Sequence, residues 1–128
     1  MILERLTKII LVLVGLVNFF PVIGLTSSEK LASLYGIDAP GGDLLILLQH
    51  RALLFGVLGA IIICSAFRHH LRRAAVIMGF LSMLGFIVLL LLSNNYGGKL
   101  WTVALVDLIA SIALAIVAVP VFRKSPTA

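Results

Sequence analysis

Three polar residues in succession, Gln49, His50 and Arg51, stand inside a long apolar stretch, and Asp107 is the single charged residue of another. Arginine, histidine and aspartate side chains can exchange protons or bind a charged or hydrogen-bonding group. Within an apolar region such side chains are costly, so they usually face a partner or mark a binding site. These residues are the first candidates for chemistry.

Their positions place these side chains at a similar depth. Arg51 and Asp107 each lie eight residues from the start of an expected helix, and Asn18 lies eight residues before the end of another. At a rise of 1.5 Å per residue, each is about 12 Å from the same side of the molecule. We therefore expect a polar cluster in which Arg51 pairs with Asp107, with hydrogen bonds completed by Asn18, Gln49 and His50.

This cluster has two interpretations. A buried ion pair can fix the arrangement of a helix bundle without adding much net stability. Alternatively, the cluster forms a ligand or proton site, which is favoured because Gln49, His50 and Arg51 crowd three polar groups into one turn where a structural pair needs one. The sequence leaves both interpretations open.

Other chemical signatures are weak. The single cysteine, Cys64, excludes an internal disulfide and a paired-cysteine redox motif. His50 is the one histidine within an expected span, which excludes a bis-histidine haem site, and His69 and His70 are interpreted as contacts to lipid headgroups. We therefore assign no catalytic residue and no metal site and leave any cofactor open, and the sequence favours a non-enzymatic role.

The composition indicates a membrane protein. Of the 128 residues 62% are hydrophobic and 12% are charged, and the mean hydropathy is +1.22. Soluble domains of this size are far more polar. The net charge of +5 does not indicate nucleic-acid binding, because the Lys and Arg residues mostly flank the apolar segments, where membrane topology requires them.

Four apolar runs are long enough to cross a bilayer as helices, since about 20 residues span its hydrocarbon core. They cover about residues 6–26, 44–67, 74–92 and 100–122. The connections are too short for a second domain, so residues 1–128 form one transmembrane domain. We predict an all-α fold, an integral membrane four-helix up-and-down bundle with antiparallel neighbours.

Between the first two spans, we predict a short interfacial helix over residues 27–36. The segment begins with capping residues and ends at Gly36, and Leu31, Leu34 and Tyr35 are expected to face lipid. Pro21 removes a backbone donor near the end of the first span and should kink it or loosen its last turns.

Small residues indicate close helix packing. In the second span Ala52, Gly56 and Ala60 repeat every four residues, with Gly59 beside them, and Asp107 lies on a similar stripe in the fourth span. Such stripes allow transmembrane helices to approach closely. Asp107 is therefore expected to point inward.

The positive charges predict the orientation, because Lys and Arg flanking the spans stay on the cytoplasmic side. One side of the membrane receives seven of them and the other side receives Lys30 and Lys99; the seven are Arg5, Lys8, Arg68, Arg72, Arg73, Arg123 and Lys124. Both termini should be cytoplasmic, in a bacterial inner (plasma) membrane. Tyr96 and Trp101 are placed as interfacial anchors.

The pattern resembles the DoxX-like superfamily of small four-helix membrane proteins. The resemblance rests on Pro21, on the Leu34, Tyr35, Gly36 segment, and on Arg51 followed by small and apolar residues to Gly59. It implies a four-helix bundle with a role near quinones, redox partners or lipids, and it transfers no catalytic residue. Similar small proteins often carry the automated label phosphopantetheine adenylyltransferase, but this chain has no Gly-rich phosphate loop.

Three functions remain open at this point. The first is an outward-facing pocket, floored by Arg51, Asp107 and His50, for an amphipathic ligand such as a lipid, quinone or isoprenoid. The second is a small proton-coupled transporter, acting as a homodimer, with Asp107 as the proton carrier. The third is an accessory subunit of a larger membrane complex, whose partner protein supplies the chemistry.

Overall fold

The computed structural model describes residues 1–94 and 97–124, so Tyr96 lies outside the described residues. Two short 3-10 segments, η1 and η2, stand beside five α-helices. In chain order the elements are α1 (Ile2–Phe19), η1 (Phe20–Leu25), α2 (Ser28–Tyr35), α3 (Gly42–Phe67), η2 (His69–Leu71), α4 (Arg72–Leu92) and α5 (Gly98–Arg123).

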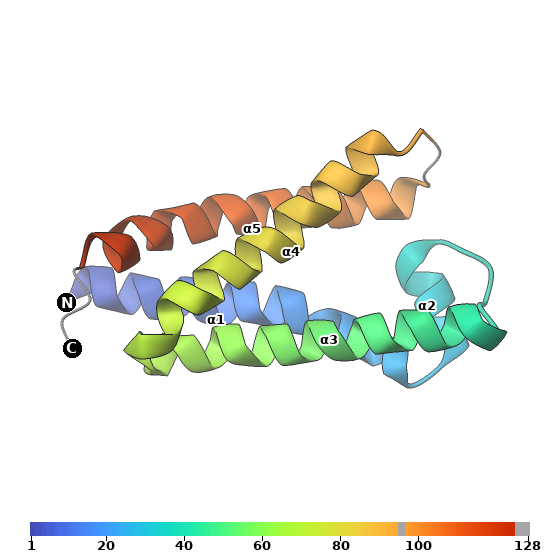
Figure 1. The fold of residues 1–128 in the computed structure, drawn as a ribbon, viewed down its shortest axis with the longest axis horizontal. Helices are drawn as coiled ribbons and strands as arrows, with labels where there is room; N and C mark the ends of the chain where they lie inside the picture. Colours follow the sequence, from blue (N-terminus) through green and yellow to red (C-terminus); the bar gives the residue numbers. More distant parts are fainter. Residues whose placement is uncertain (95–96, 125–128) are drawn as a thin grey trace.

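The four long helices form an up-and-down bundle (Figure 1). α1 packs against α3 and α5, and α4 packs against the same two helices. Three of these contacts join long helices that follow one another in the chain, as the short connections require, and the contact between α1 and α5 closes the bundle. α4 runs obliquely and diverges from α3, and α2 lies at the end where they separate, which we call the α2 end. The fold is all-α among the described residues, as predicted.

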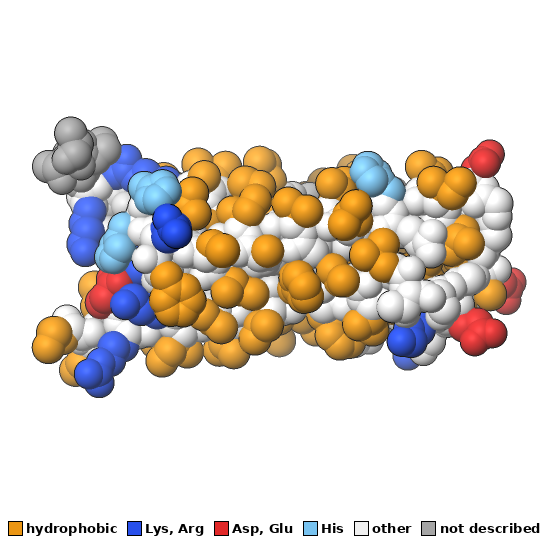
Figure 2. Space-filling model, turned by 90° about the horizontal axis from the view of Figure 1, so that it is seen from below, with side chains coloured by type: hydrophobic (Ala, Val, Ile, Leu, Met, Phe, Trp, Pro, Cys, Tyr) orange, Lys and Arg blue, Asp and Glu red, His pale blue; other side chains and the backbone are white. Residues whose placement is uncertain are grey.

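Four helical stretches are long and apolar enough to cross a membrane, which indicates a multi-pass membrane protein. They begin within five residues of the predicted positions. Figure 2 shows hydrophobic side chains covering the face between two charged ends, with Lys, Arg and His gathered where α1 begins. We call this the basic end. Exposed leucine and isoleucine side chains on all four helices provide the surface that lipid would cover.

Pro21 acts as the sequence predicted. α1 ends at Phe19, and the chain continues as the 3-10 segment η1 with proline in its first turn. Proline cannot supply the backbone donor that the α-helical ladder needs. The first span therefore changes pitch near its end.

α2 forms where expected but packs differently. The Ser27 hydroxyl accepts a hydrogen bond from the Lys30 backbone N–H at 3.1 Å, and Gly36 ends the helix in the left-handed conformation at φ 64°. The prediction that Leu31 and Tyr35 face lipid is wrong, because they are only 0% and 5% exposed. Their apolar face is buried against the rest of the bundle, so α2 closes one end of it.

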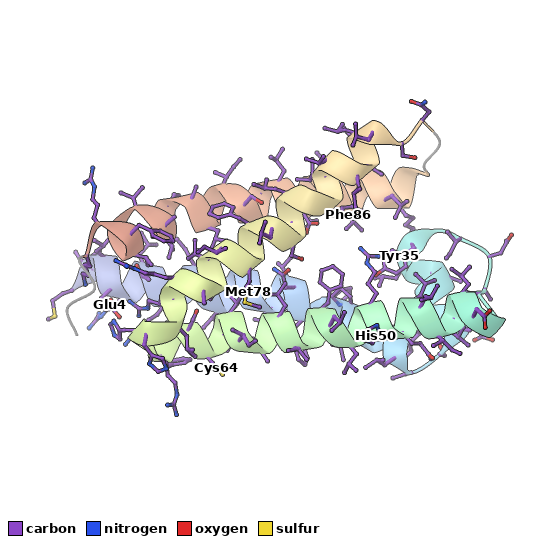
Figure 3. The ribbon with its side chains drawn as sticks, in the orientation of Figure 1. Glu4, Tyr35, His50, Cys64, Met78 and Phe86 are labelled. Carbon is purple, nitrogen blue, oxygen red and sulfur yellow. The ribbon has the colours of Figure 1, made fainter. Side chains whose placement is uncertain are left out.

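A buried arginine, Arg72, joins three helices at the basic end. Arg72, which is 5% exposed, donates to both carboxylate oxygens of Glu4 at 2.6 and 3.0 Å (Figure 3 labels Glu4). It also donates to the backbone carbonyls of Ser65 and Ala66 at 3.1 and 3.0 Å. These carbonyls belong to the last turn of α3, whose oxygens lack partners within the helix. Arg72 thereby caps α3 and fastens it to α1.

This ion pair was not predicted from the sequence, where Arg72 served only as one of the positive charges that predict the orientation in the membrane. The Glu4 carboxylate also lies 3.5 Å from the His69 imidazole. A lone acidic residue before the first span, opposite a basic turn, was the available signal.

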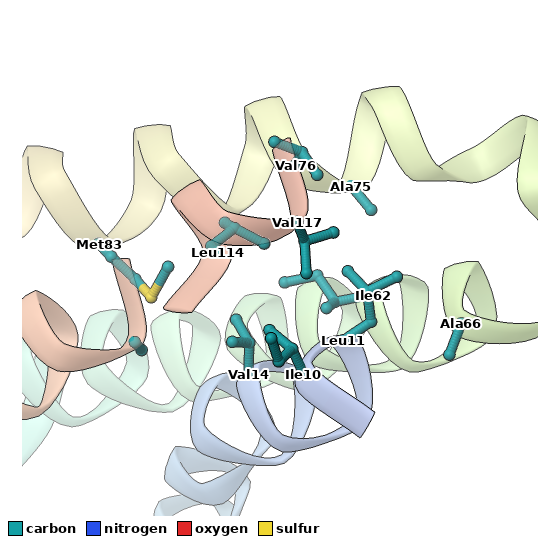
Figure 4. Close-up of a cluster of buried hydrophobic side chains, with 11 residues drawn as sticks. Ile10, Leu11, Val14, Ile62, Ala66, Ala75, Val76, Met83, Leu114 and Val117 are labelled. Carbon is teal, nitrogen blue, oxygen red and sulfur yellow. The ribbon is translucent and has the colours of Figure 1, made fainter. Parts of the chain in front are cut away.

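The hydrophobic core draws on all four long helices and lies mostly in the half of the bundle nearer the basic end (Figure 4). Leu11, Ile62 and Leu114 are fully buried, and Val76 and Met83 of α4 are 1% exposed. Because lipid is as apolar as these side chains, their association depends on close packing more than on escape from water.

The tightest approach is between α1 and α3. A Cβ added to Gly59 would lie 2.6 Å from the Gly15 carbonyl oxygen and 2.6 Å from the Phe19 nitrogen. The small-residue stripe predicted for α3 is therefore real at Ala52, Gly56 and Gly59, which are buried, whereas Ala60 is exposed. This approach sets the distance between α1 and α3 between the two ends of the bundle.

We predict that Gly59→Ala lowers the thermal stability of the detergent-solubilised protein. The added methyl group meets backbone atoms that cannot rotate away, and overpacking of this kind costs about 1–3 kcal/mol. The control is Gly85→Ala, because nothing lies within 4 Å of a Cβ at Gly85 of α4. Equal melting temperatures for the two variants would contradict the close approach of α1 and α3.

Candidate functional site

A cavity of about 520 Å³ lies at the α2 end. Its walls come from α1, η1, α2, α3 and α5, and most of its surface is apolar, including Val17, Phe20, Ile23, Val103 and Val106. A volume of about 300–1,000 Å³ is typical of sites for small molecules. The packing of α2 against the bundle, which the sequence did not predict, supplies one of these walls.

Arg51 lines this cavity and is surrounded by aromatic rings. Its guanidinium carbon lies 4.9 Å from the ring centre of Phe55, 5.2 Å from that of Tyr35 and 5.4 Å from that of Phe86. Figure 3 shows Tyr35 and Phe86 at the α2 end, on α2 and α4 respectively. We call these three rings the aromatic cage. A guanidinium over a ring face gains a cation–π attraction, which is larger where water is excluded.

The direct ion pair expected between Arg51 and Asp107 is not formed. Among the described residues, the ion pairs within 4.0 Å involve Glu4 alone as the acid. No described residue accepts a hydrogen bond from the Arg51 guanidinium, although Arg51 is only partly exposed. The aromatic cage holds the guanidinium within α2, α3 and α4, whereas Asp107 belongs to α5.

Asp107 lines the same cavity from the opposite helix. It is half-buried, and Arg51 is near enough to act on its carboxylate electrostatically. From the first residues of their helices, Gly42 and Gly98, both side chains lie about 14 Å along the axis. The shared depth inferred from the sequence therefore brings the two charges to one cavity without direct contact.

Asn18 is the third predicted residue in the cavity wall and the most deeply buried, at 3% exposed. Its side-chain amide donates to the Val14 carbonyl at 2.9 Å and contacts the Met83 sulfur at 3.7 Å. Asn18 therefore bonds within α1 and to α4 instead of completing the hydrogen bonds of Arg51. Its amide oxygen accepts no hydrogen bond from a described residue.

Gln49 and His50 do not line the cavity. The Gln49 side chain donates to the Leu25 carbonyl at 3.3 Å, tying α3 to the end of η1, and His50 is exposed on the outside of α3. Successive residues of a helix point about 100° apart, so Arg51 and its two neighbours cannot share one face. The floor of Arg51, Asp107 and His50 expected from the sequence lacks its histidine.

Two lysines complete the cavity wall, and neither was predicted to belong to it. Lys30 of α2 and Lys99 of α5 line the cavity and are exposed. A Cβ added to Gly36 would lie 2.6 Å from Lys99 Cγ, so the lysine chain passes over the end of α2. The available signal was that these are the only two basic residues in the loops of that side.

The comparisons with known proteins add no family. Among the described residues, no three His, Cys, Asp or Glu side chains are placed to hold a metal ion. The resemblance to the DoxX-like superfamily remains a prediction from the sequence. No protein-family model, no curated protein and no solved structure matches the chain.

Proposed function

We propose that this protein binds an amphipathic ligand, a lipid, quinone or isoprenoid, in the cavity at the α2 end. The observation that carries the proposal is an arginine without a protein acceptor among the described residues, held by aromatic rings in the wall of an apolar cavity. Charged residues within spans commonly mark ligand or ion pathways. The apolar walls suit a hydrocarbon chain, and Arg51 and Asp107 suit a polar head.

The proposal includes an orientation. The basic end carries the clustered Lys and Arg residues, so the positive-inside rule assigns it to the cytoplasm and the α2 end to the opposite side of a bacterial inner membrane. Both termini are then cytoplasmic, since α1 begins and α5 ends at the basic end. The cavity opens on the non-cytoplasmic half, where lipids of the outer leaflet can reach it.

We expect the wild-type protein, purified in mild detergent from native membrane, to retain an amphipathic molecule detectable by native mass spectrometry. Arg51→Ala should reduce its occupancy about tenfold or more, because a charge-assisted hydrogen bond contributes about 1.5–3 kcal/mol. Val103→Trp, which fills the cavity and leaves every charge in place, should reduce it as well.

The control is Arg5→Ala, which removes an exposed arginine at the basic end and should leave occupancy unchanged. Melting temperatures identify any variant that has lost its fold. Retention of the molecule by folded Arg51→Ala and folded Val103→Trp would place the ligand elsewhere and end the proposal.

The orientation is tested by cysteine labelling in a Cys64→Ser background, since Cys64 is exposed and single. A membrane-impermeant maleimide should label Asp38→Cys, at the α2 end, in cells whose outer membrane has been permeabilised. It should label Arg123→Cys only after the inner membrane is permeabilised. The reverse pattern would show that the cavity faces the cytoplasm.

A further inference from the structure

The charges in the cavity wall are unbalanced. Among the described residues that line it, Arg51, Lys30 and Lys99 are cationic and Asp107 is the one acid. None of these cations has an ion-pair partner within 4.0 Å among the described residues. The contrast with the basic end is direct, because Arg72 there is fully engaged by Glu4 and by two backbone carbonyls.

The surroundings of Arg51 leave the N–H groups of its guanidinium available to a ligand. The ring centres lie 4.9 to 5.4 Å from the guanidinium carbon, and a ring face gives the guanidinium N–H groups no oxygen or nitrogen acceptor. With no described acceptor for these N–H groups, a ligand in the cavity can receive them. Two parallel N–H groups match the two oxygens of a carboxylate or phosphate, which is the geometry that arginine binds best.

The lysines extend this preference to the mouth of the cavity. Lys30 and Lys99 are exposed, stand on α2 and α5, and border the same opening. Like-signed charges along a low-dielectric wall raise the local concentration of the opposite charge. The cationic side chains that line the cavity would therefore attract an anionic head both at the mouth and at Arg51.

We infer that the ligand is an acidic amphiphile, with a carboxylate or phosphate head against Arg51 and an apolar chain along Val17, Phe20, Ile23, Val103 and Val106. The inference rests on the proposed function and narrows it. A neutral head, such as an alcohol or a quinone carbonyl, leaves Arg51 without a direct ion pair in a largely apolar site, which is costly. An oxyanion compensates that charge and uses two donors at once.

For an acidic ligand, Asp107 and Arg51 should have opposite effects on affinity. The Asp107 carboxylate lines the same cavity as Arg51 and, when ionised, repels an anion there. Removing its charge therefore strengthens the binding of an acid and leaves the binding of a neutral analogue unchanged. A purely structural role for Asp107 predicts no such difference between the two ligands.

The experiment measures binding of palmitate and hexadecanol, which share one chain length and differ in head charge, to the purified protein in nanodiscs of neutral lipid. Hexadecyl phosphate tests the phosphate head, and acetate tests an anion without a chain. Palmitate and hexadecyl phosphate should bind at least about tenfold more tightly than hexadecanol, and acetate should not bind measurably.

Variants test which residues bind the acidic head. Arg51→Gln should reduce palmitate affinity to that of hexadecanol, Asp107→Asn should increase palmitate affinity several-fold, and Arg5→Gln should change neither. Lys30→Gln with Lys99→Gln should slow palmitate association with little effect on hexadecanol.

The possible outcomes distinguish failure of the acidic head from failure of the proposed amphiphile site. Equal affinities of the wild-type protein for palmitate and hexadecanol would overturn the acidic head and leave an amphiphile site standing. Absence of binding by all three long-chain ligands would remove the site itself. Equal binding of acetate and palmitate would show a simple anion site and overturn the apolar half of the inference.

Discussion

The structure at the α2 end depends on the need to accommodate one guanidinium inside an apolar bundle. Arg51 lies about 14 Å along α3, a helix long and apolar enough to cross a membrane, where a charged side chain is costly. Aromatic rings from α2, α3 and α4, instead of a carboxylate, contact the guanidinium. Because the ring faces provide no oxygen or nitrogen acceptor, the N–H groups of Arg51 have no acceptor among the described residues, and a ligand in the cavity can receive them.

The two ends of the bundle treat arginine in opposite ways. At the basic end, Arg72 is buried by its contacts with Glu4 and with the last carbonyls of α3, so its donors are spent on holding helices together. At the α2 end, Arg51 spends none of its donors on described residues. The Gly15 and Gly59 approach lies between these ends and fixes α1 beside α3, which keeps the cavity wall in place.

Much of the fold follows from the sequence because hydrocarbon thickness sets the length of each span and charge marks its ends. Pro21 and the caps of α2 are local signals, and both elements formed as expected. The burial of Leu31 and Tyr35 was not predictable in this way, since an apolar face suits lipid and protein equally well. The aromatic cage was also missed, because Tyr35 and Phe86 meet Arg51 only through tertiary packing.

The most direct test is an experimental structure of the protein extracted with its native lipid. The aromatic cage and the unbalanced charges of the cavity predict elongated density between α1, α2 and α5, with its polar end within hydrogen-bond distance of the Arg51 guanidinium. An empty cavity with Arg51 turned onto the Asp107 carboxylate would contradict this, and would reassign both residues to holding the bundle together.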